Sequence, residues 1–184
     1  NQLPNVLIGN GGANTLSGEA GDDVLSGGGA SDVYLFALGD GKDRIVDGAF
    51  YQTDRLKLLD ATEEQVRLVR RGSSGDLTVV VGASGDEVQL ADFYVNAAIG
   101  IEQVELASGI VLDRAYLVSH AEQLGTEDAD TLNASEDSDR IFGFGGADLL
   151  KGFGGSDTLL GGAGMQGHRC HAGLSDRGWD RAAG

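Results

Sequence analysis

The sequence predicts an all-β protein in which two parallel β-roll blocks flank a small antiparallel β segment. Three observations lead to this prediction. A nine-residue motif recurs near both ends of the chain, an aliphatic or aromatic residue recurs in phase with it, and the stretch between the blocks alternates apolar and polar residues. We expect a first roll block at 1–35, a β-rich capping segment at 36–124, a second roll block at 125–164 and an atypical, disordered tail at 165–184.

The second block contains most of the repeats. Each unit has an acid at position six and an aliphatic residue at position eight. The complete units are GTEDADTLN (125–133), ASEDSDRIF (134–142), GFGGADLLK (143–151) and GFGGSDTLL (152–160), followed by a partial unit, GGAG (161–164). Their position-six residues are Asp130, Asp139, Asp148 and Asp157, and their position-eight residues are Leu132, Ile141, Leu150 and Leu159.

The same frame fits the N-terminal block. Its units are GNGGANTLS (9–17), GEAGDDVLS (18–26) and GGGASDVYL (27–35). Position six is occupied by Asn14, Asp23 and Asp32, and position eight by Leu16, Leu25 and Tyr34. A disordered Gly/Asp-rich linker would share this composition, but it would not keep an apolar residue in phase with an acid across every unit.

The repeat length sets the geometry that we expect. Residues around position eight form a short strand with the apolar side chain facing inward. Glycines allow the backbone to turn with positive φ, where other residues are strained. Nine residues then make one strand and one turn, and two units make a full coil, so that every second unit stacks at about 4.8 Å.

This stacking brings like charges together. Asp130 falls above Asp148, and Asp139 falls above Asp157. Two carboxylates about 5 Å apart repel by roughly 3 kcal/mol at an effective dielectric constant of 20. A hard divalent cation between the turns reverses the sign, and carboxylate and carbonyl oxygens together match the donors that Ca²⁺ prefers better than the rigid octahedron that Mg²⁺ requires. No His or Cys lies at a repeat position, which argues against zinc there.

The pattern G-G-x-G-x-D-x-U-x resembles the calcium-binding repeat of RTX proteins, the haemolysin-type secreted proteins of Gram-negative bacteria. The resemblance implies a calcium-binding chain that is exported unfolded by type I secretion machinery and folds outside the cell or at its surface. It also implies metal ligands from position six and from glycine carbonyls at positions one, two and four. The expected carboxylate ligands are Asp23, Asp32, Asp130, Asp139, Asp148 and Asp157, and Asn14 offers a weaker, neutral oxygen. The expected carbonyl ligands are Gly9, Gly12, Gly18, Gly21, Gly27, Gly28, Gly143, Gly146, Gly152, Gly155, Gly161 and Gly162.

Some units depart from the family pattern. The unit at 134–142 has no glycine, and the unit at 125–133 has only Gly125. The sequence therefore leaves undecided whether the outer end of the second block forms metal sites. The turn at Ala30 stays open for the same reason.

The middle segment interrupts the repeat. Period-two alternation predicts antiparallel strands at 54–59, 65–71, 76–82, 86–93 and 101–112. RRGSSGDL and VGASGDEV are expected hairpin loops, and Asp113 is a candidate cap for a short helix through 113–124. The arrangement D-x-Y-x-F, then G-D-G-x-D, then a β segment resembles the haemolysin-type calcium-binding-related domain. It would cover the end of the roll, with Tyr34, Phe36, Phe93 and Tyr94 as a covering layer or as ordinary core aromatics.

Composition excludes several partners. The net charge of −16 argues against nucleic acid and against anionic membranes, and no apolar run approaches the length of about 20 residues that a membrane span needs. Glycine accounts for 31 of 184 residues. The single cysteine, Cys170, rules out an internal disulfide. The chain begins without methionine or a signal-peptide pattern, and we interpret it as an interior piece of a longer protein.

No motif predicts catalysis. Neither H-E-x-x-H nor G-x-S-x-G is present, so we expect no enzyme activity from this chain. A second hypothesis is a module that binds a polysaccharide or a surface, as in adhesins or alginate epimerases. It is motivated by Arg67, Arg70 and Arg71 on one predicted strand, although a solvated strand face explains them as well. Gln166 breaks the repeat at its sixth position, and the tail residues His168, Cys170 and His171 lack a fourth ligand, so we expect no metal site there.

Overall fold

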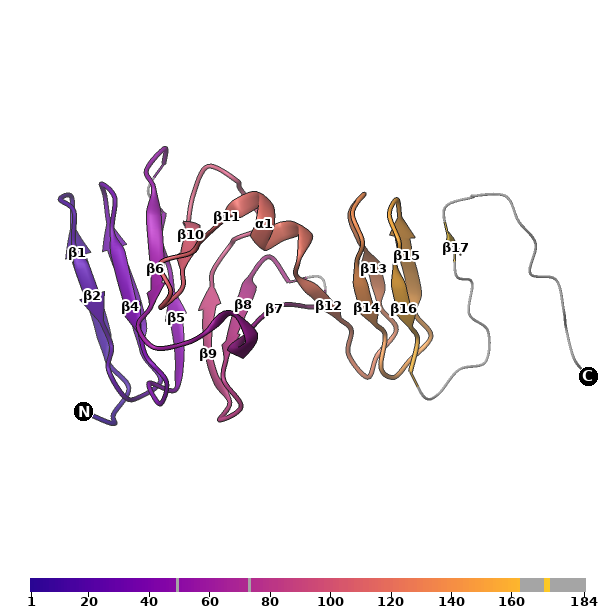
Figure 1. The fold of residues 1–184 in the computed structure, drawn as a ribbon, viewed down its shortest axis with the longest axis horizontal. Helices are drawn as coiled ribbons and strands as arrows, with labels where there is room; N and C mark the ends of the chain where they lie inside the picture. Colours follow the sequence, from indigo (N-terminus) through magenta and orange to yellow (C-terminus); the bar gives the residue numbers. More distant parts are fainter. Residues whose placement is uncertain (49, 73, 163–170, 173–184) are drawn as a thin grey trace, which may run out of the picture.

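The computed structural model describes residues 1–48, 50–72, 74–162 and 171–172. These residues form an elongated, almost entirely β structure (Figure 1) in which parallel strands dominate the sheets at both ends. The fold class predicted from the repeat is therefore confirmed. Among the described residues, no helix is long and apolar enough to cross a membrane.

The described strands form three sheets. The long sheet has, in spatial order, β1 (Val6–Asn10), β3 (Val24–Gly28), β5 (Lys42–Ile45), β9 (Asp86–Leu90), β8 (Leu77–Val81), β7 (Val66–Arg71), β12 (Glu122–Leu124), β14 (Arg140–Phe142) and β16 (Thr158–Leu160). The N-terminal short sheet has β11 (Val111–Asp113), β10 (Ile101–Glu105), β6 (Asp54–Leu58), β4 (Val33–Phe36) and β2 (Thr15–Ser17). The C-terminal short sheet has β13 (Thr131–Asn133), β15 (Leu149–Phe153) and β17 (His171–Ala172).

The stacking of every second unit is present in both blocks. β1 pairs in parallel with β3, and β2 pairs in parallel with β4, where Leu16 lies opposite Tyr34. In the second block β13 pairs with β15, so that Leu132 lies opposite Leu150. Since position-eight residues are brought into register across coils, their side chains form continuous apolar columns inside the roll, and most of them are buried.

Parallel pairing continues past the first block. β5 pairs in parallel with both β3 and β9, and β6 pairs in parallel with both β4 and β10. The prediction that 54–59 is an antiparallel strand is therefore wrong, and the prediction for 101–112 holds only for the pairing of β10 with β11, since β10 pairs in parallel with β6. Alternation reports which face of a strand is buried but not its direction, and here long connections return the chain to the sheet edge in the same direction as before.

The antiparallel part is confined to β7, β8 and β9 and to the β10–β11 pair. Both predicted hairpin loops are confirmed, since they join β7 to β8 and β8 to β9. A 3₁₀ turn, η1 (Glu63–Gln65), precedes β7.

The predicted helix is α1 (Arg114–Ser119). The Asp113 side chain caps it by accepting a hydrogen bond, 2.9 Å long, from the Tyr116 amide. The helix ends earlier than predicted, because residues 122–124 form β12 and pair with β7 and β14.

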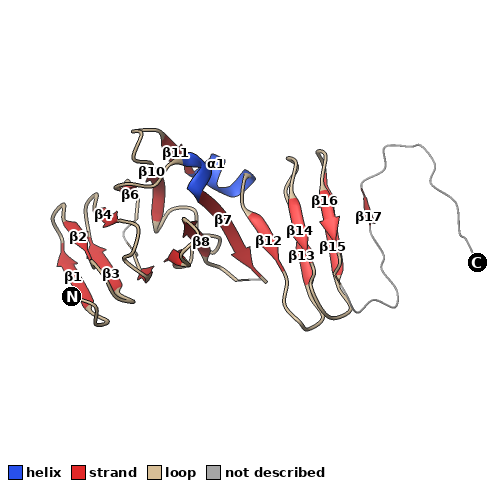
Figure 2. Ribbon diagram, turned by 60° about the horizontal axis from the view of Figure 1, so that its bottom comes forward, coloured by secondary structure: helices blue, strands red, loops and turns tan. Residues whose placement is uncertain are grey.

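The middle segment joins the two blocks through the long sheet. β12 pairs in parallel with β7 on one side and with β14 on the other, so the sheet runs without a break from the first block to the second. Helix α1 packs against β10 and β11 and buries Leu117 (Figure 2). The middle segment thus covers the inner end of each roll and supplies the strand on which the second block begins.

The apolar core is divided unequally. One cluster extends through the first block and the middle segment and contains Tyr34, Phe36 and Phe93, with Tyr94 packed against it. These aromatic residues are core residues, and Tyr34 and Phe36 belong to the inward column of the roll itself. The second block has a separate, small cluster of buried residues, Leu132, Ile141 and Leu150. The second block therefore has much less buried apolar surface to hold it together.

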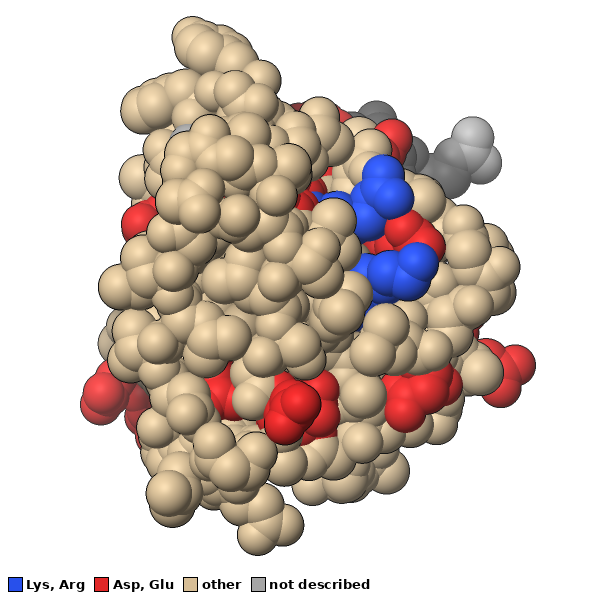
Figure 3. Space-filling model, turned by 90° about the vertical axis from the view of Figure 1, so that its left-hand side faces the viewer, with Lys and Arg blue, Asp and Glu red and all other residues tan. Residues whose placement is uncertain are grey.

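The N-terminal end of the roll is open. β1 and β2 lie at the ends of their sheets, and Leu3, Val6 and Ile8 are exposed there. Figure 3 looks onto this end: most of its surface is uncharged, and several acidic side chains lie in a band across its lower part. The tail residues Gln166, His168 and Cys170 lie outside the described residues, as does the His171 side chain.

Candidate metal centre

The position-six residues form ladders along the edges of the roll. The Asp148 carboxylate accepts a hydrogen bond from the Asp130 amide, and the Asp157 carboxylate accepts one from the Asp139 amide, both 3.1 Å long and 18 residues apart. In the first block Asp32 accepts from the Asn14 amide at 2.7 Å. Each carboxylate thus uses its Oδ1 atom to hold the turn of the preceding coil.

The ladders continue into the middle segment, where the sequence analysis predicted no ligand. Asp43 accepts from the Asp23 amide at 3.0 Å, Asp54 accepts from the Asp32 amide at 2.7 Å, and Glu102 accepts from the Asp54 amide at 2.8 Å. The sequence separation between the donor and acceptor residues widens from 18 residues to 20, 22 and 48. These acids therefore do not fall at position six of a nine-residue repeat. Only Asp43, in the motif GDGKD, could have been found from the sequence.

The second oxygen of several of these carboxylates has no partner. In the described part of the chain, the Oδ2 atoms of Asp23, Asp32, Asp54 and Asp148 are buried and accept no hydrogen bond. A buried unsatisfied polar group costs about 1–3 kcal/mol, and more when it is charged. These oxygens are therefore where the folded chain most needs a proton or a cation.

Glycine at position one makes room for each carboxylate. A Cβ atom added at Gly18, Gly27, Gly143 or Gly152 would lie under 3.0 Å from an oxygen of the position-six aspartate of the same unit. The absence of a side chain at position one therefore leaves the carboxylate its place in the loop.

Glycines at positions two and four bring neighbouring coils together. Gly21, Gly28, Gly146, Gly155 and Gly162 have left-handed φ angles between +85° and +146°. A Cβ atom on any of them would collide with a backbone carbonyl of the adjacent turn, for example that of Asn10, Asp128 or Asp137. Ala30 adopts the same conformation, with φ of +66°, at a cost of roughly 1–2 kcal/mol for a residue with a Cβ atom. Carbonyl oxygens of one loop thus face the next loop of the stack.

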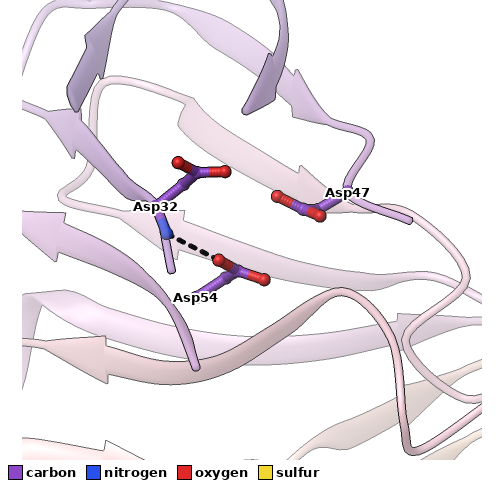
Figure 4. A group of neighbouring side chains, drawn as sticks. All are labelled: Asp32, Asp47 and Asp54. Carbon is purple, nitrogen blue, oxygen red and sulfur yellow. Dashed lines mark hydrogen bonds between the residues drawn. The ribbon is translucent and has the colours of Figure 1, made fainter. Parts of the chain in front are cut away.

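Three buried carboxylates meet where the first block joins the middle segment. Asp32, Asp47 and Asp54 each offer an oxygen within 4.8 Å of the others (Figure 4). The Tyr34 hydroxyl donates a hydrogen bond to Asp47 and accepts one from the Gly27 amide at 2.6 Å. Tyr34 therefore orients Asp47, while the unpartnered Oδ2 atoms of Asp32 and Asp54 remain for a ligand.

Burial perturbs the acids that were missed from the sequence. Desolvation raises the pKa of Asp43 and that of Asp54 to about 7, and neighbouring aspartates contribute. Burial also raises the pKa of Glu102 and of Asp40 above their ordinary ranges. Burial thus makes the charged form of these groups more costly than it is in water.

The donor set suits a hard cation. The unpartnered atoms are carboxylate oxygens, and the groups that face them across the stack are backbone carbonyls. Oxygen ligands of this kind in adaptable loops are those of Ca²⁺, whereas zinc and other softer metals take nitrogen and sulfur. The residues therefore fit calcium, and Asp23, Asp32, Asp54 and Asp148 are those that the geometry favours most.

Not every predicted ligand has this environment. The Oδ2 atoms of Asp130 and Asp139 accept hydrogen bonds within their own loops, and the Asn14 Oδ1 atom accepts one from the Asn10 amide at 2.8 Å. Like Asp148, Asp157 accepts a backbone hydrogen bond from the preceding coil through its Oδ1 atom, but Asp157 is less buried. The expected carbonyl ligands Gly9, Gly12 and Gly161 have no left-handed φ angle, and Gly9 lies within strand β1.

The arginine cluster makes contacts within the chain. Arg67 pairs with Glu122 at 2.5 Å, and Arg71 pairs with Glu87 at 2.9 Å. Arg70 donates to the Ser74 carbonyl and stacks over the Tyr94 ring, 4.3 Å from its centroid.

Comparison with known families bears on both parts of the chain. The RTX calcium-binding nonapeptide repeat (4 copies) matches residues 3–34, 124–159 and 145–164, and the haemolysin-type calcium binding protein related domain matches residues 76–116. The resemblance predicted from the sequence is confirmed: the chain carries RTX repeats and takes Ca²⁺ as its metal ion.

Comparison with other proteins adds little. A search of curated proteins found no significant match. Among solved structures, the chain is similar to the extracellular lipase LipA from Serratia marcescens, with 20% identity and a TM-score of 0.27, over 89% of this chain and 25% of the lipase. The chain thus spans a quarter of the length of that protein.

A pair of glycine substitutions tests the fit of the loop. Gly27→Ala places a methyl group against the Asp32 carboxylate, whereas Gly29→Ala in the same loop meets no atom closer than 3.5 Å. We expect Gly27→Ala to weaken calcium binding and to lower the calcium-loaded stability by roughly 1–3 kcal/mol, the usual cost of overpacking, and Gly29→Ala to change little. Isothermal calorimetry and thermal melts measure both, and equal effects of the two substitutions would contradict this account of the loop.

The raised pKa values predict an inverted pH dependence for the metal-free chain. Asp43 and Asp54 lose their protons near pH 7 when folded but near pH 4 when unfolded. Between these values the folded state binds more protons, so folding stability is highest at the acidic end and falls as pH rises toward 7. We expect a higher melting temperature at pH 5 than at pH 7.5 in metal-free buffer, and a smaller difference in the Asp43→Asn/Asp54→Asn variant. A melting temperature that rises with pH in the unsubstituted metal-free chain would contradict the assignment.

Proposed function

Because the chain carries RTX calcium-binding repeats around a haemolysin-type calcium-binding-related domain, we propose that it is a calcium-driven folding and stabilising module of a larger secreted bacterial protein. The buried Oδ2 atoms of Asp23, Asp32, Asp54 and Asp148 support this proposal most directly. When bound, calcium supplies positive charge and coordination to these oxygens. Folding of the loops and binding of the ion then become one equilibrium, in which binding free energy is folding free energy.

The two blocks differ in how much they depend on the ion. The first block shares its apolar core with the middle segment, whereas the second block buries Leu132, Ile141 and Leu150 in a cluster of its own. Burial of apolar surface contributes about 25 cal/mol per Å² to stability. Because the cluster in the second block is small, its burial free energy offsets little of the repulsion between the stacked carboxylates. We infer that the coil at 143–160 in the second block loses its structure first when calcium is removed.

This dependence suits export through a type I secretion system. Extracellular calcium modules bind with dissociation constants of about 10⁻⁴–10⁻³ M, so sites of that strength stay empty at cytosolic calcium concentrations. The chain would remain unfolded before export and fold after reaching calcium outside a Gram-negative cell. No catalytic role is proposed for these residues, and any activity of the parent protein would lie in another part of it.

The second hypothesis, binding of a polysaccharide or a surface, depended on Arg67, Arg70 and Arg71. Each of these side chains has a partner within the chain, so none of them gives a specific reason to prefer this function. We therefore retain calcium-driven folding as the proposed function.

Calcium titration tests the proposal. Far-UV circular dichroism of the purified chain should show less β-structure in chelator than in calcium and a cooperative gain of it at millimolar calcium, with a much weaker response to magnesium. Limited trypsin digestion should locate the change: Lys151 in β15 should be cut readily in chelator and protected in calcium. Identical spectra and identical protection with and without calcium would overturn the proposal.

A further inference from the structure

Repeat loops of two kinds occur in this chain, and they differ in what satisfies the position-six side chain. We propose that Thr126 and Ser135 take the place of a calcium ion at Asp130 and Asp139, so that the first coil of the second block, residues 125–142, closes without metal. The inference rests on calcium binding at the other loops. It removes Asp130 and Asp139 from the set of calcium ligands and gives these two loops a structural role instead.

The loop at 125–130 is closed by its own hydrogen bonds. The Asp130 Oδ2 atom accepts from the Thr126 amide at 2.6 Å and from the Thr126 hydroxyl at 2.9 Å. The same hydroxyl accepts from the Asp128 amide at 3.1 Å. One threonine at position two therefore satisfies both the carboxylate at position six and the amide at position four.

The loop at 134–139 repeats this arrangement with serine. The Asp139 Oδ2 atom accepts from the Ser135 amide at 2.9 Å and from the Ser135 hydroxyl at 2.8 Å, and that hydroxyl accepts from the Asp137 amide at 3.1 Å. Two consecutive units, on opposite edges of the roll, thus use a hydroxyl residue at position two for the same purpose. Asp139 is buried, yet in the described part of the chain neither of its oxygens is a buried atom without a hydrogen-bond partner.

The other loops are open, because position two has a different backbone conformation. Glu19, Gly28, Phe144 and Phe153 occupy this position with φ angles between +60° and +104°. Thr126 and Ser135 are not in the left-handed region, and a β-branched threonine strongly disfavours it. Consequently, the amide at position two donates to the position-six oxygen only in the closed loops, while the Oδ2 atoms of Asp23, Asp32 and Asp148 in open loops lack a partner.

Charge-assisted hydrogen bonds explain why the closed loops need no cation. An ionised carboxylate that accepts hydrogen bonds from an amide and a hydroxyl keeps its charge at a much lower cost than one left unpaired. In the open loops the corresponding oxygen has no donor, so that a cation becomes the remaining source of stabilisation. The residue at position two therefore determines whether a loop is stabilised by its own hydrogen bonds or requires a bound calcium ion.

The closed loops lie where each block begins. In the first block, the unit at 9–17 is closed by the Asn10 amide, which donates to Asn14, and the Asn10 side chain accepts from the Gly12 amide at 2.8 Å. In the second block the closed coil follows β12, and its strand β14 pairs with β12 on one side and with the open-loop strand β16 on the other. A metal-independent coil thus extends the sheet of the middle segment and offers a formed edge to the calcium-dependent coil.

Two matched double variants test the assignment in calcium titrations of the full chain. Asp148→Asn/Asp157→Asn removes the carboxylates of open loops, and we expect it to reduce the number of calcium ions bound per chain. Asp130→Asn/Asp139→Asn removes those of closed loops, and we expect the same number of ions as in the unsubstituted chain, with affinities changed by no more than about threefold. Asn14 shows that an amide oxygen is accommodated in a closed loop. An equal loss of calcium in both variants would overturn the inference.

Hydrogen exchange in chelator provides a second readout that does not depend on calcium affinity. We expect the amides of Thr126, Asp128, Ser135 and Asp137 to be more protected than those of the coil at 143–160. Thr126→Val/Ser135→Ala removes the hydroxyls and should abolish this difference, whereas Thr131→Val, outside the loop on β13, should leave it unchanged. Uniform exchange across both coils of the unsubstituted chain would contradict the inference.

These experiments distinguish a failure of the proposed function from a failure of the distinction between closed and open loops. If the unsubstituted chain binds no calcium, the proposed function is wrong. If it binds calcium and loses it when Asp130 and Asp139 are substituted, only the distinction between closed and open loops is wrong.

Discussion

The structure depends on the burial of carboxylate oxygens that have no donor within the chain. At the open loops of Asp23, Asp32 and Asp148, one oxygen of the position-six aspartate holds the turn of the neighbouring coil, and the other is buried beside the position-one glycine without a hydrogen-bond partner. The first contact fixes the stacking of the coils, and the second makes that stacking unfavourable while the oxygen carries an uncompensated charge. In the proposed function, calcium resolves this conflict because it needs the oxygen ligands that the loops already bring together.

The middle segment is more than a cover for the roll. Its strands β5, β6, β9 and β10 continue the parallel stacking of the first block, and its acids Asp43, Asp54 and Glu102 continue the ladders. Its apolar core merges with that of the first block. The antiparallel strands β7 and β8 then carry the long sheet to β12, where the second block begins. The coils that we propose to depend on calcium are thus attached to a part of the molecule that has a substantial core of its own.

The repeat made the fold class and the stacking of coils predictable from the sequence. The spacing between Leu16 and Tyr34, or between Leu132 and Leu150, was enough to place these side chains in inward columns. It could not reveal the direction of β6 and β10, since alternation is the same in parallel and antiparallel strands. It also missed Asp54 and Asp47, because their alignment with Asp32 arises from connections of irregular length.

The aspartates that the geometry favours as metal ligands were predictable only where the loop keeps its glycines. Asp23, Asp32 and Asp148 have the buried, unpartnered oxygen that the pattern predicts. Asp130 and Asp139 satisfy the same motif at position six, but a hydroxyl residue at position two changes the φ angle and the hydrogen bonds of the loop. An aspartate in the correct phase is therefore not sufficient, and the residue four places before it decides what its second oxygen contacts.

The most direct test of the central claim removes the charge instead of adding the ion. In the Asp23→Asn/Asp32→Asn/Asp148→Asn/Asp157→Asn variant, the amide oxygen can still accept the ladder hydrogen bond, and the amide nitrogen can donate to the carbonyls of the neighbouring loop. If unpaired carboxylate charge is what opposes folding, circular dichroism in chelator will show more β-structure for this variant than for the unsubstituted chain, and calcium will change its spectrum little. A variant that stays as unfolded in chelator as the unsubstituted chain would contradict the account.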